Sequence, residues 1–345
     1  PLTQEWNFSL QQDLGHGVVM EIAYTGSNTH KLWKRYDQNQ CIQVPFVLPS
    51  YANASSCTGF RPYNAFGQGI LTSTTFGASN FNGGSVKVEK RSSNGLFILG
   101  SYQWSKNLDN SSGEAGANDS SFATNTAFDH SYSNFDVRNR AAISGGYELP
   151  FGKGHRLLSK GIGNALAGGW TFQPAIQLRT GYPFNISASG CNFAANIACR
   201  VFLAPGRTVA SSYRKSPSPF DWFDATAFSG NPNAATVTRV GSGGCVATAP
   251  TNYCAAGRAI PTVQGWVTRN VGRGPGTAQV DFSAIKNLHV TQRVNAQFRA
   301  EAYNIINRGI FSNPNANINT PTTLGKVTGT SADNRSIQLA IKVLF

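Results

Sequence analysis

Charged residues two positions apart recur in segments where apolar and polar residues alternate. Side chains two apart point to the same face of an extended strand, so each set would form one charged wall. Two interpretations remain open: a wall that contacts a passing solute or another domain, and a hydrated ladder of mutually paired charges. The residues concerned, with two single charges in similar segments, are Lys87, Glu89, Arg91, Arg138, Arg140, Arg179, Asp281, Arg299 and Glu301.

No catalytic signature accompanies these charges. The sequence lacks a nucleophile elbow, an HExxH motif, a P-loop and a dinucleotide fingerprint, and its five histidines are far apart. We therefore predict no enzyme activity, no resident metal and no cofactor. Asp129 and His130 lie beside serines, which could suit proteolysis, but a solvated loop is the simpler interpretation. The stretch from Asp109 to Glu114, with Asp119, offers oxygen ligands for calcium without EF-hand spacing, and an ordinary polar loop is again favoured.

The cysteines suggest an oxidising compartment. Six cysteines allow 15 connectivities, and the simplest pairs each one with its near neighbour in sequence, which would staple one loop per pair. Free thiols in loops are the alternative. CxxC motifs are absent, which argues against a zinc site. The three pairs would be Cys41–Cys57, Cys191–Cys199 and Cys245–Cys254.

Bulk composition narrows the class of protein. Charged residues are only 13% of the chain, whereas soluble domains usually carry about 25%. The net charge of +13 comes from scattered Lys and Arg rather than from basic runs, so we predict no nucleic-acid partner. A basic lumen, or loops that face lipopolysaccharide phosphates, explains that charge better. No long apolar window suggests a transmembrane helix.

Nine segments alternate apolar and polar residues with period two, and their connections are alternately short and long. Long strands, charges in mid-strand and aromatic residues near strand ends argue against a soluble sandwich or propeller. We predict an all-β fold, an antiparallel transmembrane β-barrel with about nine strands present as a partial barrel. The expected strands are 3–12, 18–27, 84–91, 96–107, 135–149, 170–180, 277–288, 294–306 and 336–345.

The last segment orients this barrel. It ends on Phe345, and if that end is periplasmic, every short turn is periplasmic and all cysteine-bearing loops are external. The charged sets would then line the lumen, where a hydrated ladder is the simpler interpretation because a wide barrel interior needs polar filling. The predicted location is the bacterial outer membrane, with lipid and lipopolysaccharide as surroundings. The terminal aromatic resembles the signal read by the barrel-assembly machinery, although Phe345 could also be merely the last lipid-facing residue.

Several segments, in order, resemble Oar-like TonB-dependent receptors. They include VKVEKRSSNGLFILGSYQWSKNLDNSS, FDVRNRAAISGGYELPFGKG, GGWTFQPAIQLRTGYPF, GRGPGTAQVDFSAIKNLHVTQRVNAQFRAEAYNIINRGIF and the closing RSIQLAIKVLF. The resemblance covers nearly the whole chain, and divergence concentrates in the long loops. It implies a barrel of about 22 strands with an N-terminal plug, a carboxypeptidase-regulatory-like domain and energy from the TonB complex.

The chain departs from that pattern, with nine strands, no plug and no TonB box. We expect residues 1–345 to be the C-terminal barrel part of a longer exported receptor, with the plug and N-terminal domains absent, so that TonB would act through the missing plug region. The first functional hypothesis is a receptor or transporter for an unknown solute. The alternative is an adhesin-like surface-binding barrel without active transport; an outer-membrane enzyme has least support.

Overall fold

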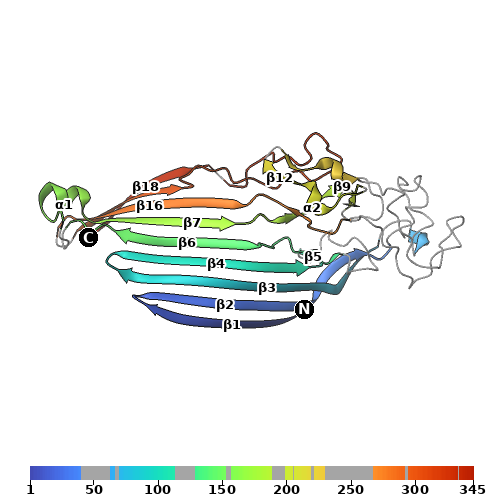
Figure 1. The fold of residues 1–345 in the computed structure, drawn as a ribbon, viewed down its shortest axis with the longest axis horizontal. Coiled ribbons are helices and arrows are strands. Elements are labelled where there is room, and N and C mark those ends of the chain that lie inside the picture. The colour runs from blue at the N-terminus through green and yellow to red at the C-terminus, as the bar shows by residue number, and fades with distance from the viewer. Residues whose placement is uncertain are drawn as a thin grey trace.

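The computed structural model shows one long, twisted antiparallel sheet (Figure 1). It describes residues 1–39, 63–66, 70–112, 129–152, 157–188, 199–204, 206–218, 221–229, 267–291, 294–332 and 334–345. The nine long strands follow the order β1-β2-β3-β4-β6-β7-β16-β17-β18, with β5 attached to β4. Their bounds are β1 (Leu2–Gly15), β2 (Val18–Asp37), β3 (Leu71–Ser93), β4 (Leu96–Asp109), β6 (Asn139–Glu148), β7 (Trp170–Arg179), β16 (Thr277–His289), β17 (Asn295–Tyr303) and β18 (Ser336–Leu344).

The predicted all-β antiparallel fold with nine strands is confirmed, as an open sheet whose edges are β1 and β18. Each strand pairs with its sequence neighbour among the nine, and the registers keep apolar residues in line. Phe8 lies opposite Tyr24, and Ile22 opposite Val86. Asn94 and Gly95 form the hairpin turn between β3 and β4, with positive φ at both residues, as a type I′ turn requires.

Two strands are longer than the sequence pattern predicts. The expected strands end at residue 27 and begin again at residue 84, yet β2 continues to Asp37 and β3 begins at Leu71. Some of their added pairs are polar, such as Asn28 opposite Asn80, and others include an apolar residue, such as Leu32 opposite Gly77. Strict alternation is lost there, because Asn28, Thr29 and His30 are consecutive polar residues and register shifts follow between His30 and Lys34, so the period-two signal ends before the strand does.

The expected strand 135–149 begins later than predicted, at Asn139. Asp136 instead closes a turn, in which its amide donates to the carbonyl of Ser133. Its carboxylate accepts from the amide of Asn107, 2.7 Å away. A side chain that satisfies the backbone of a neighbouring strand thus replaces part of the ladder.

The two ends of the sheet differ, as predicted (Figure 1). The C-terminus and the short connections lie at one end, which also carries α1 (Gly161–Ala167) between β6 and β7. The long connections lie at the other. Their short elements are η2 (Asn64–Phe66), β5 (Ser131–Tyr132), β8 (Pro183–Phe184), β9 (Ser187–Ala188), β10 (Cys199–Arg200), β11 (Phe202–Leu203), α2 (Val209–Ser212), β12 (Tyr213–Ser218), β13 (Asp221–Phe223), η5 (Ala225–Ala227), β14 (Phe228–Ser229) and β15 (Gly272–Arg273).

The buried apolar core lies in these long connections, and Ile285 is the one residue of the nine long strands among the buried hydrophobics of the described chain. A cluster joins two connections that are separate in sequence, the one after β7 and the one after β17. Aromatic contacts hold its centre, with the rings of Phe223 and Phe228 edge to face at 5.8 Å. Its members are Phe184, Ile186, Val201, Phe223, Ala227, Phe228, Val267 and Leu324.

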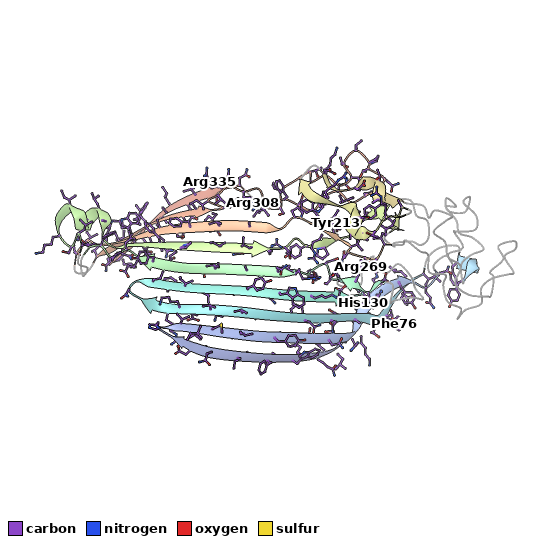
Figure 2. All side chains as sticks on the ribbon, viewed as in Figure 1. Phe76, His130, Tyr213, Arg269, Arg308 and Arg335 are labelled. Atoms are coloured by element: carbon purple, nitrogen blue, oxygen red, sulfur yellow. The ribbon has the colours of Figure 1, made fainter. Side chains whose placement is uncertain are left out.

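The sheet itself leaves its apolar face uncovered, and side chains project from both faces (Figure 2). Phe8 is 68% exposed and Ile341 is 74% exposed. An aqueous protein buries such a face, because each large apolar side chain gains about 1.5–3 kcal/mol on leaving water. A contiguous apolar band of this kind requires a non-aqueous covering. None of the helices among the described residues is long and apolar enough to cross a membrane.

Candidate functional site

Three ion pairs with at least one fully buried partner stabilise the long-loop end of the sheet. The first joins Lys34 of β2 to Asp129, which precedes β5. The lysine Nζ lies 2.8 Å from Asp129 Oδ2, and the two side chains are 1% and 0% exposed. The expectation that Asp129 lies in a solvated loop is therefore wrong, because its carboxylate is buried against Lys34. Its neighbour His130 is exposed at the same end (Figure 2).

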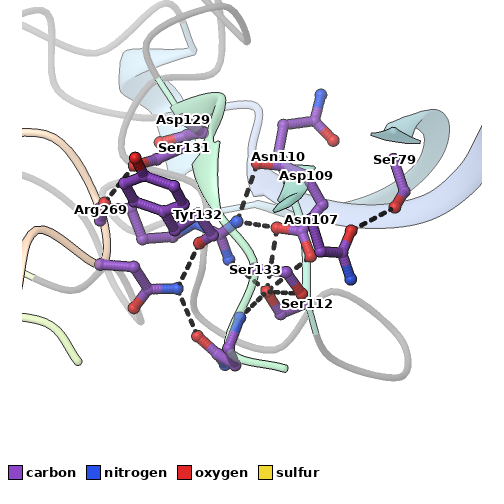
Figure 3. Close-up of polar contacts among 12 residues, drawn as sticks. Ser79, Asn107, Asp109, Asn110, Ser112, Asp129, Ser131, Tyr132, Ser133 and Arg269 are labelled. Carbon is purple, nitrogen blue, oxygen red and sulfur yellow. Dashed lines mark hydrogen bonds and ion pairs between the residues drawn. The ribbon is translucent and has the colours of Figure 1, made fainter. Parts of the chain in front are cut away.

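The second pair connects Arg269, from the connection after β7, to Asp109 at the end of β4 (Figure 3). The Arg269 guanidinium donates to the Asp109 carboxylate, to the Asp109 carbonyl at 2.9 Å and to Ser112 Oγ at 2.9 Å. Ser112 in turn donates to both carboxylate oxygens of Asp109. Burial lowers the pKa of Arg269 to about 10, so it stays charged near neutral pH.

The third pair anchors Arg273 to the buried carboxylate of Asp136, with Nη2 and Oδ2 2.5 Å apart. Arg273 also donates to the carbonyl of Gly181 at 3.0 Å. Its guanidinium carbon lies 5.4 Å from the ring centre of Tyr132, and that of Arg138 lies 5.3 Å from the same ring. Arg138 additionally donates to the Tyr132 hydroxyl at 2.9 Å. Lys106 Nζ lies 5.9 Å from the same ring centre, so one tyrosine of β5 contacts three cations.

Asn270 completes the connection between these loops. It adopts a positive φ of 56° and is 2% exposed. Its amide nitrogen donates to the Tyr132 carbonyl at 2.7 Å and to Asn134 Oδ1 at 2.6 Å, and its backbone N–H donates to Asn185 Oδ1 at 2.8 Å. Residues 269–273 therefore form a strap that joins the long connection after β7 to the segment around β5.

A groove opens beside this strap, with a volume of about 610 Å³, in the usual range for ligand sites. Its floor is one cross-strand row: Tyr102 pairs with Ala141, which pairs with Leu178, which pairs with Ala278. Trp222, Arg179, Arg273 and Arg308 are among the other residues that line it. Because Arg273 is engaged by Asp136, Arg179 and Arg308 are the lining cations with no ion pair among the described residues. Ala278 alternates with Val280 and Phe282 on β16, so the floor of the groove belongs to the apolar face of the sheet.

The charged residues singled out in the sequence lie along the polar face or near its ends. Lys87 lies 3.6 Å from Glu89, and Arg299 lies 4.0 Å from Glu301. These contacts resemble a paired ladder, but they are exposed, and such pairs contribute about 0–1 kcal/mol. Asp281 accepts from Gln279 and from the amide of Asn304.

Two of the predicted residues form an unusual pair, because Arg140 lies directly opposite Arg179 in the register. Neither makes an ion pair in the part of the chain that the structure describes, and Arg179 stacks on Tyr182 at 4.3 Å. Arg138 lies just before β6, so it is not part of the strand that carries Arg140. The backbone amide of Arg91 donates to the carbonyl of Gly17 at the short-turn end. That these charges line a lumen remains a prediction.

Sequence reasoning missed the buried ion pairs, although it named Asp109 and Asp129 as candidates for other roles. Their partners are 95, 160 and 137 positions apart, and nothing in the local pattern marks them. Within the described residues, no group of three His, Cys, Asp or Glu side chains is placed to hold a metal ion, and Asp109 is engaged by Arg269. Glu114, Asp119 and the three proposed cysteine pairs lie outside the described residues, except for the backbone of Cys199.

The antiparallel sheet, its uncovered apolar face and the asymmetry of its ends define a β-barrel of the outer-membrane type. The family model of the outer membrane beta barrel domain matches residues 1–338. The chain belongs to this family, and its location is the bacterial outer membrane, as predicted. A search of the curated proteins finds no match.

Solved structures resemble the chain at low identity. They include the outer membrane transporter YddB from Escherichia coli (11% identity, TM-score 0.48, 99% of this chain and 32% of that one). BauA, the ferric preacinetobactin receptor from Acinetobacter baumannii, is similar (11%, TM-score 0.42, 99% and 29%). FpvA of P. aeruginosa is a third (9%, TM-score 0.42, 99% and 27%). The chain spans about a third or less of the length of these proteins.

Proposed function

We propose that this chain is the C-terminal barrel portion of a TonB-dependent, Oar-like receptor that takes up a solute or binds it at the cell surface. Membership of the outer-membrane barrel family and the ordered resemblance of its strand motifs to Oar-like receptors support this function. In this proposal the plug and N-terminal domains belong to the rest of the protein, and the TonB complex acts through the plug.

The observation that carries the receptor proposal is the construction of the long-loop end. The connections there have their own apolar core and buried ion pairs. We call these packed long connections the cap. The cap has a defined shape, which favours selective binding because little ordering is needed when a ligand arrives. The short turns at the opposite end have no comparable core among the described residues.

The charged residues on the polar face of the sheet support this proposal less strongly than the packed long connections do. In a closed barrel they would line the lumen, where Arg140 and Arg179 would attract an anionic solute or a carboxylate of the plug. The paired charges, such as Lys87 with Glu89, would mainly hydrate the wall. No side chain of the chain is assigned a catalytic step.

Solute depletion from growth medium tests transport even while the ligand is unidentified. Strains with the intact receptor, without the receptor gene and without TonB are grown in one complex medium, whose solutes are followed by mass spectrometry. We expect at least one solute that only the intact strain depletes, with the same defect in both mutants. Identical depletion by all three strains would contradict TonB-dependent transport.

The alternative is an adhesin-like barrel, which the same packed external loops would also suit. Binding to surfaces would then require the loops but not TonB. Attachment of the three strains to coated surfaces separates the two functions. Loss of attachment in the receptor mutant alone, with normal solute depletion, would favour the adhesin.

A further inference from the structure

The helix α1 is attached to the sheet by two side chains that bond its C-terminal carbonyls. Lys286 Nζ donates to the carbonyl of Leu166 at 3.0 Å and to that of Gly168 at 2.9 Å. The indole N–H of Trp170 also donates to the Leu166 carbonyl, at 2.8 Å. The lysine lies 5.0 Å from the indole ring centre. The last carbonyls of a helix lack partners within it, and here the sheet supplies them.

Both of these side chains belong to the apolar face. Trp170 is the register partner of Lys286, which is the partner of Phe298, which is the partner of Ile341. Lys286 is thus a single cation in an apolar row, and it is nevertheless 9% exposed. Since Lys286 points to the apolar face and bonds the carbonyls of Leu166 and Gly168, the C-terminal end of α1 lies on that side, and the helix extends beyond the short-turn end of the sheet (Figure 1).

The helix presents its apolar stripe away from the protein. Ile162, Ala165 and Leu166, at spacings of three and one, are exposed, whereas Asn164 and Ala167 are half-buried. Ile162 is 78% exposed and Leu166 is 69% exposed. A surface helix in water shows the opposite pattern, with its apolar stripe toward the core. The preceding Leu157 and Leu158 are also exposed.

We propose that α1 is an interfacial helix that inserts Ile162, Ala165 and Leu166 into the periplasmic leaflet of the outer membrane, with phospholipid as its partner. The apolar face of an outer-membrane barrel contacts lipid, and the short-turn end is the periplasmic end. Amphipathic helices lie at such interfaces with their apolar side in the acyl boundary. The exposed Lys160, next to the helix, is placed to meet phosphate groups.

This arrangement also explains why a lysine occupies the apolar face. An unpaired backbone carbonyl is costly in a lipid environment, and α1 ends there with carbonyls that need donors. Lys286 provides the donors and a favourable charge at the helix C-terminus. Trp170 provides the amphipathic ring typical of membrane interfaces. The inference depends on the barrel's place in the membrane and is independent of transport.

Photo-crosslinking tests the partner directly in the full-length protein in its own outer membrane. The photoreactive residue p-benzoylphenylalanine replaces Ile162 or Leu166, and crosslinked peptides are analysed by mass spectrometry after irradiation. The matched control is Asn287, which adjoins Lys286 in sequence but points to the polar face. Ile341, on the apolar face, is the lipid reference.

We expect phospholipid adducts at Ile162 and Leu166 in yields within about threefold of Ile341, and none at Asn287. Adducts to another protein, or to another segment of this one, at both helix positions would overturn the proposal. So would the absence of lipid adducts at both positions while Ile341 forms them.

Discussion

Arg269 and Asp109 lie 160 positions apart in the sequence and meet in a buried ion pair at the long-loop end of the sheet. The pair connects the long segment after β7 to the end of β4. Arg269 also donates to Ser112 Oγ and to the Asp109 carbonyl. The shape of the external surface therefore depends on contacts between segments that are remote in sequence.

Breaking this pair should loosen the cap. Asp109→Ala leaves the Arg269 charge buried without its carboxylate, which typically costs about 3–5 kcal/mol. We expect faster amide exchange at Ser131, Tyr132 and Ser133, with the sheet unaffected. Hydrogen exchange followed by mass spectrometry measures this. The control is Asp221→Ala, whose pair with Arg214 is exposed (44% and 57%) and should contribute at most about 1 kcal/mol; equal effects of the two changes would refute the role of the buried pair.

Asp224 should make the stability of the cap sensitive to acid. The Thr226 hydroxyl, which donates to its carboxylate, is the main cause that lowers the pKa of Asp224, and the charges of Arg207 and Arg214 add to the effect. A depressed folded-state pKa stabilises the fold above the ordinary carboxyl pKa, near 4, and the contribution is lost as pH falls through the folded-state value.

The matching variant is Asp224→Asn, which keeps the shape and removes the titrating group. Asn caps a helix about as well as Asp, so only the charge interactions are lost, and we expect wild type to exceed the variant in free energy of unfolding at pH 7 by about 0.2–1 kcal/mol. Below pH 4 the difference should shrink toward zero. Urea denaturation in phospholipid vesicles at several pH values provides the test, and a difference that grows with acid would show that the sign is wrong.

The pair of Arg140 and Arg179 should lower the free energy of unfolding while it supports solute uptake. Like charges directly opposite each other on a sheet repel, so Arg140→Gln should raise the free energy of unfolding by a few tenths of a kcal/mol. If the pair attracts an anionic solute or the plug, the same change should reduce solute depletion severalfold. Arg299→Gln is the control, because Arg299 already has Glu301 beside it. A stabilised variant with full uptake would exclude a functional role for the pair.

Phe345 should matter for assembly rather than for stability. Its side chain is fully exposed at the end of the chain, so it makes little packing contribution. Deletion of Phe345 should lower the fraction of protein inserted in the outer membrane, whereas Phe345→Tyr should restore it. The readout is heat-modifiable electrophoretic mobility of the membrane fraction. Normal insertion of the deletion variant would rule out the signal.

The long strands were predictable because their registers satisfy a local rule. Residues such as Phe8, Ile22 and Val86 alternate with polar ones, and two strands joined by Asn94-Gly95 need only that turn. The rule fails where alternation is interrupted, as it is from Asn28 to His30, so the outer part of β2 was not predicted to be a strand. It also carries no information on which distant segments pack together.

The packing of the cap could not be predicted from local patterns, because it depends on which distant segments contact one another. Val201, Phe223 and Leu324 come from segments without periodicity, and their burial depends on one another. Likewise, Asp129 next to a histidine and serines suggests a solvated loop until Lys34, 95 positions away, is placed beside it. Helix α1 was missed because its seven residues lie in a glycine-rich connection.

Binding of TonB tests the proposed function most directly. The purified full-length receptor, in detergent micelles, is titrated with the periplasmic domain of TonB, and binding is followed by calorimetry. The account predicts a saturable one-to-one complex that is lost when the segment N-terminal to the barrel is removed. The absence of any binding by the full-length receptor, in preparations whose barrel is folded, would contradict a TonB-dependent receptor.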